Sequence, residues 1–323
     1  MIDPAQIRIA AIVNSFNRKD LLVESLTSLR NNALSQMGNS AAIVVFDAGS
    51  TDGSREFAEN FDAGAIRIEV IGPNADDNSF SAGLNAACAH AIRIFPALEF
   101  LFLFETDNWI GSEAPLRAAI DLLERKKNLG AVGFTVRKHT GDAAGYGCSF
   151  PTRFEFALGP QLSHRFGLGG PNQSKWETEG ATEFRTCDVV YTSPLLARKE
   201  AWVRSSGLDA MEFPFSDCDL DWAWRLRKMG FEMAVLRTDE VVHDNRETKS
   251  KWSETRALHL HRARMRLLER HRPGGLPLKP LLLARHFAEL LAALCVGFMT
   301  QNWASAIRKR WKLLTGVFGG YRF

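Results

Sequence analysis

Short apolar runs alternate with amphipathic segments through the first half of the chain. In the segments between these runs, such as residues 19–32 and 112–127, apolar residues recur at the spacing of one helix face. Near-continuous apolar strands alternating with helices are typical of βαβ units. We therefore predict an α/β domain on a mostly parallel sheet flanked by helices. The expected strands are residues 7–13, 41–46, 65–72 and 98–104, and further expected helices cover 50–61 and 81–95.

The regular pattern stops between residues 141 and 183, where glycine, proline and aromatic residues dominate. This stretch is too long for a plain connection, so we expect a functional loop or an excursion beside the site. A helix followed by a strand is again expected over residues 216–236. After residue 246 the pattern is helical, with a last apolar helix near 281–300.

Charge divides the chain into an acidic body and a basic tail. From residue 246 onward there are 16 Lys and Arg against 4 Asp and Glu, which gives a net charge of +12. The residues before it contain 24 Lys and Arg against 33 Asp and Glu, which gives a net charge of −9. We therefore predict a catalytic domain over residues 1–245 and a basic, partly amphipathic helical extension over residues 246–323. Such a tail favours an anionic partner.

The tail contains a long apolar stretch that Arg285, His286 and Glu289 interrupt. A spanning helix needs some 20 apolar residues with few charges. We therefore expect a helix lying in the plane of an anionic membrane surface, with residues 308–312 as a further anchor. Packing against the catalytic domain or a partner subunit is the alternative, and a homo-oligomer is compatible with it. No recognition motif indicates nucleic acid.

The cysteines and the first residues indicate a cytoplasmic protein. Five scattered cysteines have neither a disulfide framework nor metal-like spacing, which is typical of reduced thiols. The first residues lack the charged and apolar regions of a signal peptide. With the basic tail, this predicts a peripheral protein on the cytoplasmic face of the inner membrane.

Polar clusters follow three of the expected strands, at residues 14–18, 47–54 and 105–108. Ligands of open parallel sheets bind outside the carboxyl ends of the strands, so these clusters share one edge. The acids of "ETDN" are oxygen ligands suited to Mg²⁺ or Mn²⁺, which prefer substrate phosphates as co-ligands. Each cluster taken alone also fits an ordinary turn or helix cap.

Six segments in chain order resemble glycosyltransferase family 2 on a GT-A fold. They are "VNSFNR", "FDAGSTDGS", "FSAGLNAA", "LFLFETDN", "SDCDLDWAWRLRKMGF" and "VVH", within residues 7–243. The resemblance implies inverting transfer of a sugar from a nucleotide diphosphate to an acceptor hydroxyl. Relatives of the rhamnosyl- and galactofuranosyltransferase type suggest a UDP or dTDP donor and a lipid-linked or cell-surface glycan as acceptor.

The resemblance also implies roles for the acids. Asp107 matches the last acid of the family's metal-binding motif, Glu105 takes the place of its first acid, and His243 matches a histidine that completes the site. Asp217 falls on the general base, which takes the proton of the attacking hydroxyl. Asp219 is the alternative base.

Further residues are assigned to the nucleotide and the acceptor on the same resemblance. Trp222 and Trp224 could stack on an acceptor sugar, although aromatic residues in a helix more often belong to the core. Asp47 would bind the nucleobase. The nucleotide-binding residues are Asn14, Phe16, Asn17, Arg18, Asp47, Ser50, Asp77, Ser81, Asn85 and Thr106.

The chain departs from the family pattern at two acids, and two other functions stay open. Glu105 replaces the usual first metal-binding acid, and Ser216 replaces the glutamate before the base. These changes allow a non-catalytic nucleotide-sugar or membrane-binding module derived from such an enzyme. A sugar-phosphate nucleotidyltransferase is the other alternative, although the chain lacks a glycine-rich basic loop after the first strand.

Overall fold

The computed structural model describes residues 3–73, 78–145, 147–167, 174–244, 253–274, 277–296 and 303–319. The chain divides into two compact units. The first contains Met1–Cys148 and Gln173–Arg246, and the second contains Ser149–Asn172 and Glu247–Phe323. The chain therefore passes into the second unit twice, and residues 149–172, which the sequence assigned to the catalytic domain, belong to the second unit.

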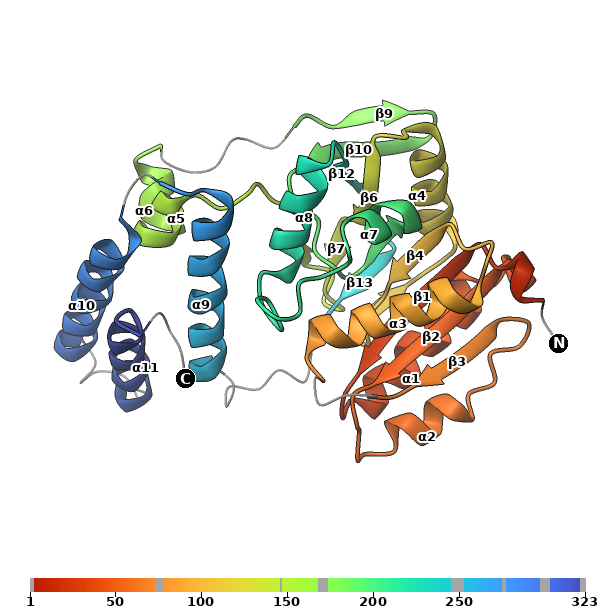
Figure 1. The fold of residues 1–323 in the computed structure, drawn as a ribbon, viewed down its shortest axis with the longest axis horizontal. Helices are drawn as coiled ribbons and strands as arrows, with labels where there is room; N and C mark the ends of the chain where they lie inside the picture. The colour runs from red at the N-terminus through yellow and green to blue at the C-terminus, as the bar shows by residue number, and fades with distance from the viewer. Residues whose placement is uncertain are drawn as a thin grey trace. The chain divides into compact units, whose positions relative to one another are not determined.

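A nine-stranded mixed sheet forms the centre of the first unit, counted over the described residues. Its strands are β1 (Ile9–Ser15), β2 (Ala41–Asp47), β3 (Arg67–Ile71), β4 (Phe100–Leu103), β6 (Leu129–Phe134), β9 (Glu177–Glu179), β10 (Thr182–Cys187), β11 (Leu195–Arg198) and β12 (Glu232–Leu236). Their order is β3-β2-β1-β4-β11-β6-β12-β10-β9 (Figure 1). Strands β1 to β4 run parallel, as predicted, whereas β11 is antiparallel to both β4 and β6.

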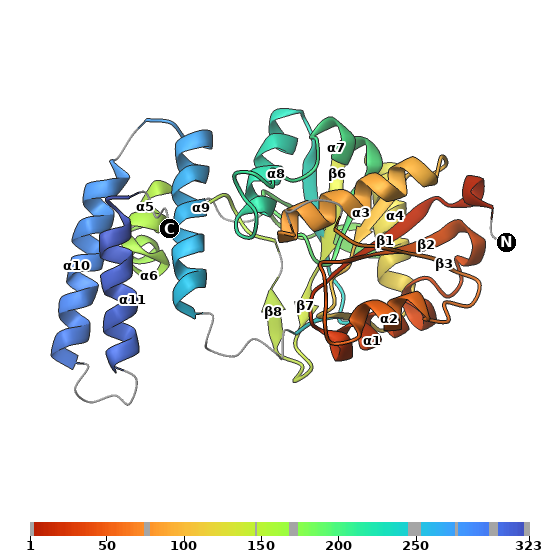
Figure 2. The same cartoon turned by 60° about the horizontal axis from the view of Figure 1, so that its bottom comes forward.

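Helices cover both faces of this sheet, which is why β1, β2 and β4 are apolar along their length. On one face, Leu22 of α1, Ala58 of α2 and Leu122 of α4 belong to one apolar core together with alternate residues of β1 and β2. Helix α3 packs on the opposite face of β1 and β2, and α7 lies on the same side as α3 (Figure 2). The helices are α1 (Lys19–Ser28), α2 (Ser54–Glu59), α3 (Phe80–Ile94), α4 (Ala114–Arg125), α7 (Lys199–Arg204) and α8 (Cys218–Lys228).

A second, four-stranded sheet of short strands contains part of the candidate site. Its order is β5-β13-β7-β8, with β5 (Asn108–Ile110), β13 (Val241–His243), β7 (Val136–Arg137) and β8 (Ala143–Gly145). Strands β5 and β13 are antiparallel, so that Asn108 lies opposite His243. This pairing places the end of the "ETDN" segment beside "VVH", far away in sequence.

The second unit is helical in its described part. It contains α5 (Arg153–Leu158), α6 (Pro160–Arg165), α9 (Ser253–His271), α10 (Leu278–Val296) and α11 (Trp303–Gly316). Arg153 joins the two stretches of this unit, because its guanidinium donates to the carbonyl of Arg272 at 2.8 and 3.0 Å. Arg285 likewise donates to the carbonyl of Phe156. Among the described helices, none is long and apolar enough to cross a bilayer.

Candidate active site

Strands β1, β2 and β4 end at one edge of the sheet, and polar side chains follow each of them. Ser15 at the end of β1 pairs in register with Asp47 at the end of β2. The backbone N–H of Phe104 donates to the carbonyl of Ile12 at 2.9 Å, which brings Glu105 level with the end of β1. The predicted meeting of the three polar clusters at one edge is confirmed.

Asp47 is fully buried and divides its two carboxylate oxygens between two tasks. Oδ1 accepts the backbone N–H groups of Gly49, at 3.0 Å, and Ser50, at 2.8 Å, and so closes the turn after β2. Oδ2 accepts no hydrogen bond from any described residue. Because an unsatisfied buried acceptor is costly, this oxygen is suited to an N–H donor of a ligand. The nucleobase contact of Asp47 stays a prediction.

The loops after β1 and β2 are bound to each other. The backbone N–H of Asn17 donates to Ser50 Oγ at 2.9 Å, and Asn17 Oδ1 accepts the N–H of Thr51 at 2.7 Å. Asn14 donates to the carbonyl of the first residue of α3 at 3.2 Å, and Phe16 is 56% exposed. Asn17 thus fixes the two loops against each other, Phe16 is the exposed side chain beside them, and their nucleotide contacts stay predictions.

Glu105, Asp107 and Arg18 form a cluster at this edge, around the buried Thr106. Arg18 Nη1 lies 3.5 Å from Asp107 Oδ2. Burial raises the pKa of Glu105 well above its ordinary value, and the charge of Asp107 raises it further, whereas Arg18 opposes the shift. Glu105 and Asp107 thus share the single charge of Arg18, which lies 3.5 Å from Asp107. This cluster therefore favours a further positive charge.

His243 meets Asp107 at the same place. Its Nδ1 lies 3.4 Å from Asp107 Oδ1 and is hydrogen-bonded to Asn108 Oδ1 at 2.8 Å. Asp107 is buried, and its Oδ1 accepts no hydrogen bond within the described part of the chain. The structure therefore brings together two residues that the resemblance assigned to one metal site, although they are far apart in sequence.

These residues fit a cation that is held jointly with a phosphate-bearing ligand. Within the described residues, no three or more His, Cys, Asp and Glu side chains are arranged so that they could hold one metal ion. Mg²⁺ is usually held by one or two carboxylates together with water and substrate phosphates, so a complete protein cage is not required. Asp107 and His243 supply such a partial set, because the buried Oδ1 of Asp107 accepts no hydrogen bond from a described residue and lies 3.4 Å from Nδ1 of His243.

The beginning of α8 places two further acids at this edge. Asp217 precedes the helix, is buried, and has a left-handed backbone conformation with φ 59° and ψ 12°. That conformation costs a non-glycine residue about 1–3 kcal/mol and is commonest at functional sites. The charge of Asp219 raises the pKa of Glu105, so this carboxylate is near the acid cluster. Asp217 and Asp219 both remain candidates for the base.

Two residues of "FSAGLN" have structural partners within the chain, and their nucleotide contact stays a prediction. The Ser81 hydroxyl is fully buried and donates to the carbonyl of Phe213 at 2.6 Å. The Asn85 carboxamide donates to the carbonyl of Leu208 at 2.7 Å and accepts its N–H at 2.9 Å. Both side chains tie α3 to the segment before Asp217. Asp77 lies outside the described residues.

The tryptophans of α8 also differ from their predicted acceptor role. The Trp222 indole is fully buried and donates through Nε1 to Ser205 Oγ at 2.7 Å, so it offers no face to a sugar. Trp224 is 7% exposed. The helical spacing that brings them into the core is the alternative that the sequence had left open.

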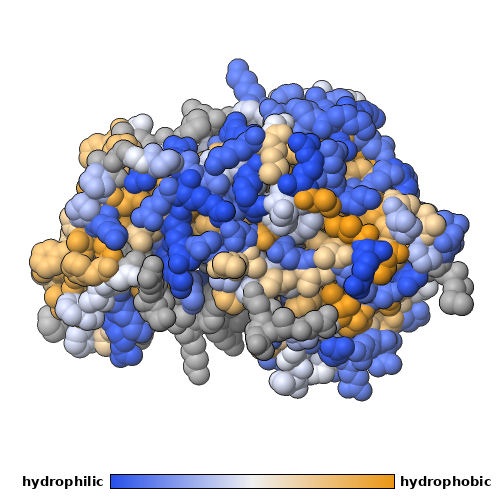
Figure 3. Space-filling model, in the orientation of Figure 1, coloured by the Kyte–Doolittle hydropathy of each residue, from blue (hydrophilic) through white to orange (hydrophobic). Residues whose placement is uncertain are grey.

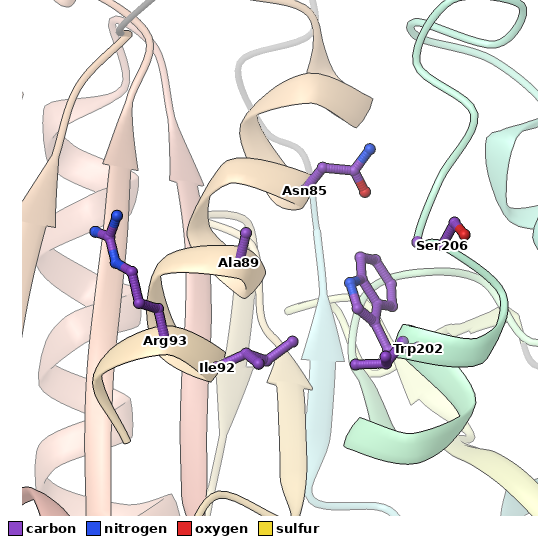
Figure 4. Close-up of a pocket in the computed structure, with 8 residues that line it drawn as sticks. Asn85, Ala89, Ile92, Arg93, Trp202 and Ser206 are labelled. Carbon is purple, nitrogen blue, oxygen red and sulfur yellow. The ribbon is translucent and has the colours of Figure 1, made fainter. Parts of the chain in front are cut away.

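A pocket of about 390 Å³ lies between α3 and α7, away from the acids (Figure 4). Figure 4 shows the Trp202 ring facing α3, with Ile92 and Ala89 opposite. Of the predicted site residues, only Asn85 lines it. The pocket is therefore separate from the candidate active site.

Two residues of the site were missed in the sequence. Asn108 and Ser193 are hydrogen-bonded to each other, and Ser193 Oγ also accepts the backbone N–H of Glu105 at 3.0 Å. Asn108 could have been found from its place directly after Asp107. Ser193 gave no signal, because its contact depends on how a distant loop folds.

Comparison with known proteins agrees with this geometry. Residues 10–156 match the family model described as Glycosyl transferase family 2. No curated protein sequence matches the chain. The structure of S. aureus TarS 1–349 in complex with UDP-GlcNAc aligns with a TM-score of 0.54 at 12% identity, covering 98% of this chain and 80% of that one.

The mannosyltransferase PcManGT from Pyrobaculum calidifontis, in complex with GDP-Man and Mn²⁺, gives the same TM-score at 17% identity, covering 99% of this chain and 89% of that one. These likenesses confirm the GT-A fold, which both proteins share with this chain. Residues 10–156, less than half of the chain, thus resemble glycosyltransferase family 2, and together with the site at the sheet edge this match supports a glycosyltransferase.

Proposed function

We propose that this glycosyltransferase moves a sugar, with inversion, from a nucleotide diphosphate to an acceptor hydroxyl with the help of Mn²⁺ or Mg²⁺. The observation that supports this is the meeting of Asp107 and His243 beside Glu105, at the edge where the acids of α8 begin. The family match favours this activity over nucleotidyl transfer.

On the donor side, Asp47 binds the nucleobase through its free Oδ2, and Arg18 lies within reach of the diphosphate. Asp107 and His243 would hold the cation, with Glu105 as a further ligand once it is deprotonated. A divalent cation at this position supplies charge neutralisation on the departing diphosphate. That one neighbour in fold was solved with GDP-Man and Mn²⁺, and another with UDP-GlcNAc, supports such a donor.

On the acceptor side, Asp217 takes the proton of the attacking hydroxyl, with Asp219 as the alternative. In a direct displacement the hydroxyl must lose its proton as it attacks the anomeric carbon, and a positioned carboxylate contributes about 10²–10⁴-fold to the rate. Holding Asp217 in a strained, buried turn is consistent with a fixed orientation toward the acceptor.

Calorimetry tests the donor site. UDP, dTDP, GDP and CMP are titrated with and without Mn²⁺ into the wild type and Asp107→Ala. We expect one diphosphate to bind tightly only with Mn²⁺ and only when Asp107 is present. Binding that needs neither would remove the cation from the mechanism, and no binding at all would favour the non-catalytic module.

The base is tested separately by Asp217→Asn. We expect turnover to fall about 10²–10⁴-fold while the affinity for the nucleotide stays unchanged. Asp219→Asn serves as the comparison: if it abolishes turnover and Asp217→Asn does not, the base is Asp219.

We also propose that the second unit binds an anionic membrane surface, which would bring the enzyme to a lipid-linked or cell-surface glycan on the cytoplasmic face of the inner membrane. Phe287, Leu291 and Leu294 of α10 are 54%, 46% and 43% exposed and, at spacings of four and three, share one helix face. Figure 3 shows apolar atoms gathered over α10. On α11, Trp311 is 56% exposed beside the basic residues 308–310. Exposed apolar side chains next to cations are typical of an interfacial helix.

Vesicle sedimentation tests this contact. We expect the chain to bind vesicles that contain phosphatidylglycerol more strongly than neutral vesicles, with a loss of binding at high salt. Phe287→Ser with Leu291→Ser should reduce binding, whereas Met211→Ser, at an 88% exposed position of the first unit, should not. Unchanged vesicle binding combined with an altered oligomeric state in the double variant would favour a subunit contact instead.

A further inference from the structure

The second sheet carries a tryptophan on its outer face. Its inner face is apolar, because Ile110 of β5 and Val241 of β13 are fully buried and belong to the core. Trp109 lies opposite Val242 in the same pair of strands. Since successive side chains of a strand point to opposite faces, these two residues share the outer face. Trp109 is 36% exposed there.

Gly111 leaves room for the indole of Trp109. A Cβ at position 111 would lie 3.2 Å from both Cζ3 and Cη2 of the indole, so the six-membered ring lies across this glycine. The backbone N–H of Gly111 donates to the carbonyl of Glu240 at 2.8 Å, which continues the pairing of β5 with β13. The indole is therefore held against a backbone that the sheet fixes.

Charged side chains lie beside this apolar surface. Arg137 of β7 pairs in register with Val242, so it shares the outer face, on the side away from Trp109. Neighbouring strands are about 4.8 Å apart, so Arg137 and Trp109 bound a strip about 10 Å wide. Arg137 forms an ion pair with Asp239. Glu240 is exposed and, two residues before Val242, lies on the same face.

An exposed aromatic ring with charged groups at its edge suits a sugar ring. The C–H groups on one face of a pyranose stack on an aromatic ring, while its hydroxyl groups point outward to donors and acceptors. One positive charge, on Arg137, against two negative ones, on Asp239 and Glu240, disfavours an anionic lipid or phosphate. One indole and one valine are too little apolar surface for a stable subunit contact, which buries about 800 Å² on each partner.

We propose that this face is a second binding site for the acceptor glycan and takes a neutral hexose ring. Trp109 provides the stacking surface, and Arg137 and Glu240 provide hydrogen bonds to the hydroxyl groups. The inference rests on the proposed glycosyl transfer to a glycan.

The position of the face fits an acceptor that extends beyond the reacting sugar. The backbone of Asp107 still belongs to the ribbon, because its carbonyl accepts the N–H of Asp244 at 3.0 Å. Two extended residues separate Asp107 from Trp109, a span of about 7 Å. A glycan bound on Trp109 is therefore within a few sugar units of the acid cluster. Such a second contact raises the local concentration of the acceptor without touching the reacting atoms.

Indole ¹H–¹⁵N spectra of tryptophan-labelled protein test binding at this residue directly. The signal of Trp109 is assigned by its loss in Trp109→Phe. Maltotriose, cellotriose and mannotriose are titrated as neutral probes, and trigalacturonic acid as an anionic one. We expect the signal to shift saturably with at least one neutral trisaccharide and not with the anionic one. The inference is overturned if no neutral probe shifts the signal, or if the anionic probe shifts it equally.

Variants measure how much the indole contributes. In ligand-observed saturation-transfer spectra, Trp109→Ala should weaken binding of the neutral trisaccharide about 10-fold, and Trp109→Phe should retain part of it. Trp176→Ala is the matched control, because the guanidinium groups of Arg185 and Arg237 lie 4.8 and 5.6 Å from the centre of its ring in the same unit. Circular dichroism verifies that each variant is folded. An equal loss in Trp176→Ala would remove the site from Trp109.

The failure of this site and that of the transferase function are distinguishable. If a trisaccharide shifts Trp109 but no nucleotide diphosphate binds, the sugar site stands and the transferase function is wrong. If a diphosphate binds and no trisaccharide shifts Trp109, the function stands and the sugar site is wrong. A change of oligomeric state in Trp109→Ala, measured by light scattering, without any shift by a trisaccharide would assign the face to a second copy of the chain and overturn the inference.

Discussion

Replacing Asn85 by alanine separates two interpretations of the "FSAGLN" segment. As a nucleotide contact, Asn85 would affect donor affinity and leave stability nearly unchanged. In the structure its carboxamide instead accepts the N–H of Leu208 at 2.9 Å and donates to the carbonyl of Leu208 at 2.7 Å. Leu208 is 3% exposed, so Asn85→Ala leaves a donor and an acceptor of the backbone without their partner.

The size of the effect follows from these two groups. Each unsatisfied buried polar group costs about 1–3 kcal/mol, which gives about 2–6 kcal/mol for the pair. Alanine favours the helix over asparagine by about 0.5 kcal/mol, which offsets a small part. The pocket beside Asn85 can admit water to the freed groups and reduce the loss further. We therefore expect destabilisation of about 2–4 kcal/mol.

Urea unfolding followed by tryptophan fluorescence measures this loss. Trp202 and Trp222, whose rings lie 5.3 Å apart in the first unit, report on the region beside Leu208. The midpoint should fall while the slope against urea stays constant. Asn60→Ala is the control, since its amide makes one exposed bond to Glu56 and should cost less than about 0.5 kcal/mol.

A loss below about 0.5 kcal/mol in Asn85→Ala, together with weaker donor binding, would refute the structural assignment and restore the nucleotide contact. A large loss of stability with unchanged nucleotide affinity in the folded variant would support it. The two measurements move in opposite ways under the two interpretations, so one variant decides between them.

Three further variants test other parts of the structure. Trp222→Phe removes the bond to Ser205 Oγ and should cost about 1–2 kcal/mol of stability without changing the KM of any acceptor, as measured by unfolding and kinetics. Gly83→Ala places a Cβ 2.8 Å from the Phe46 ring, so overpacking of about 1–3 kcal/mol should outweigh the helix gain of about 1 kcal/mol and lower the midpoint in urea. Burial lowers the pKa of His261 from 6.5 to about 4. Because the unfolded chain takes up this proton first, stability is complete above pH 6.5 and is lost as the pH falls toward 4, by up to about 3 kcal/mol. His261→Gln should flatten that dependence in melting curves between pH 7 and 4.

The sequence predicts the central strands and the edge where the acids meet, because both depend on local pattern. An apolar run between two helices becomes a parallel strand covered on both faces, and whatever follows it lies at the carboxyl end. Asp47 and Asp107 could therefore be placed at this edge from the hydrophobic pattern alone. The antiparallel β11 could not, since nothing in its four residues sets its direction.

Contacts between distant polar groups are the part that the sequence does not reveal. Ser81 and Asn85 are 132 and 123 positions from the carbonyls they bind, and a serine or asparagine near a site suits a ligand and a loop equally well. The same limit applies to Arg153, which joins residues 149–172 to the tail through a backbone carbonyl 119 positions away. Side-chain bonds to backbone have no periodicity that a sequence can display.

Helix α3 emerges as the element that connects the two halves of the proposed reaction. At its start it accepts the amide of Asn14 from the donor side, and Gly83 lets it approach Phe46 on β2. Ser81, the second residue of the helix, and Asn85, about one turn further on, anchor the segment that leads to Asp217. The distance between the donor and the proposed base is therefore set through one rigid helix. Since a misplacement of about 1 Å between reacting groups can cost about 10²-fold in rate, loosening α3 should lower kcat more than it weakens nucleotide binding.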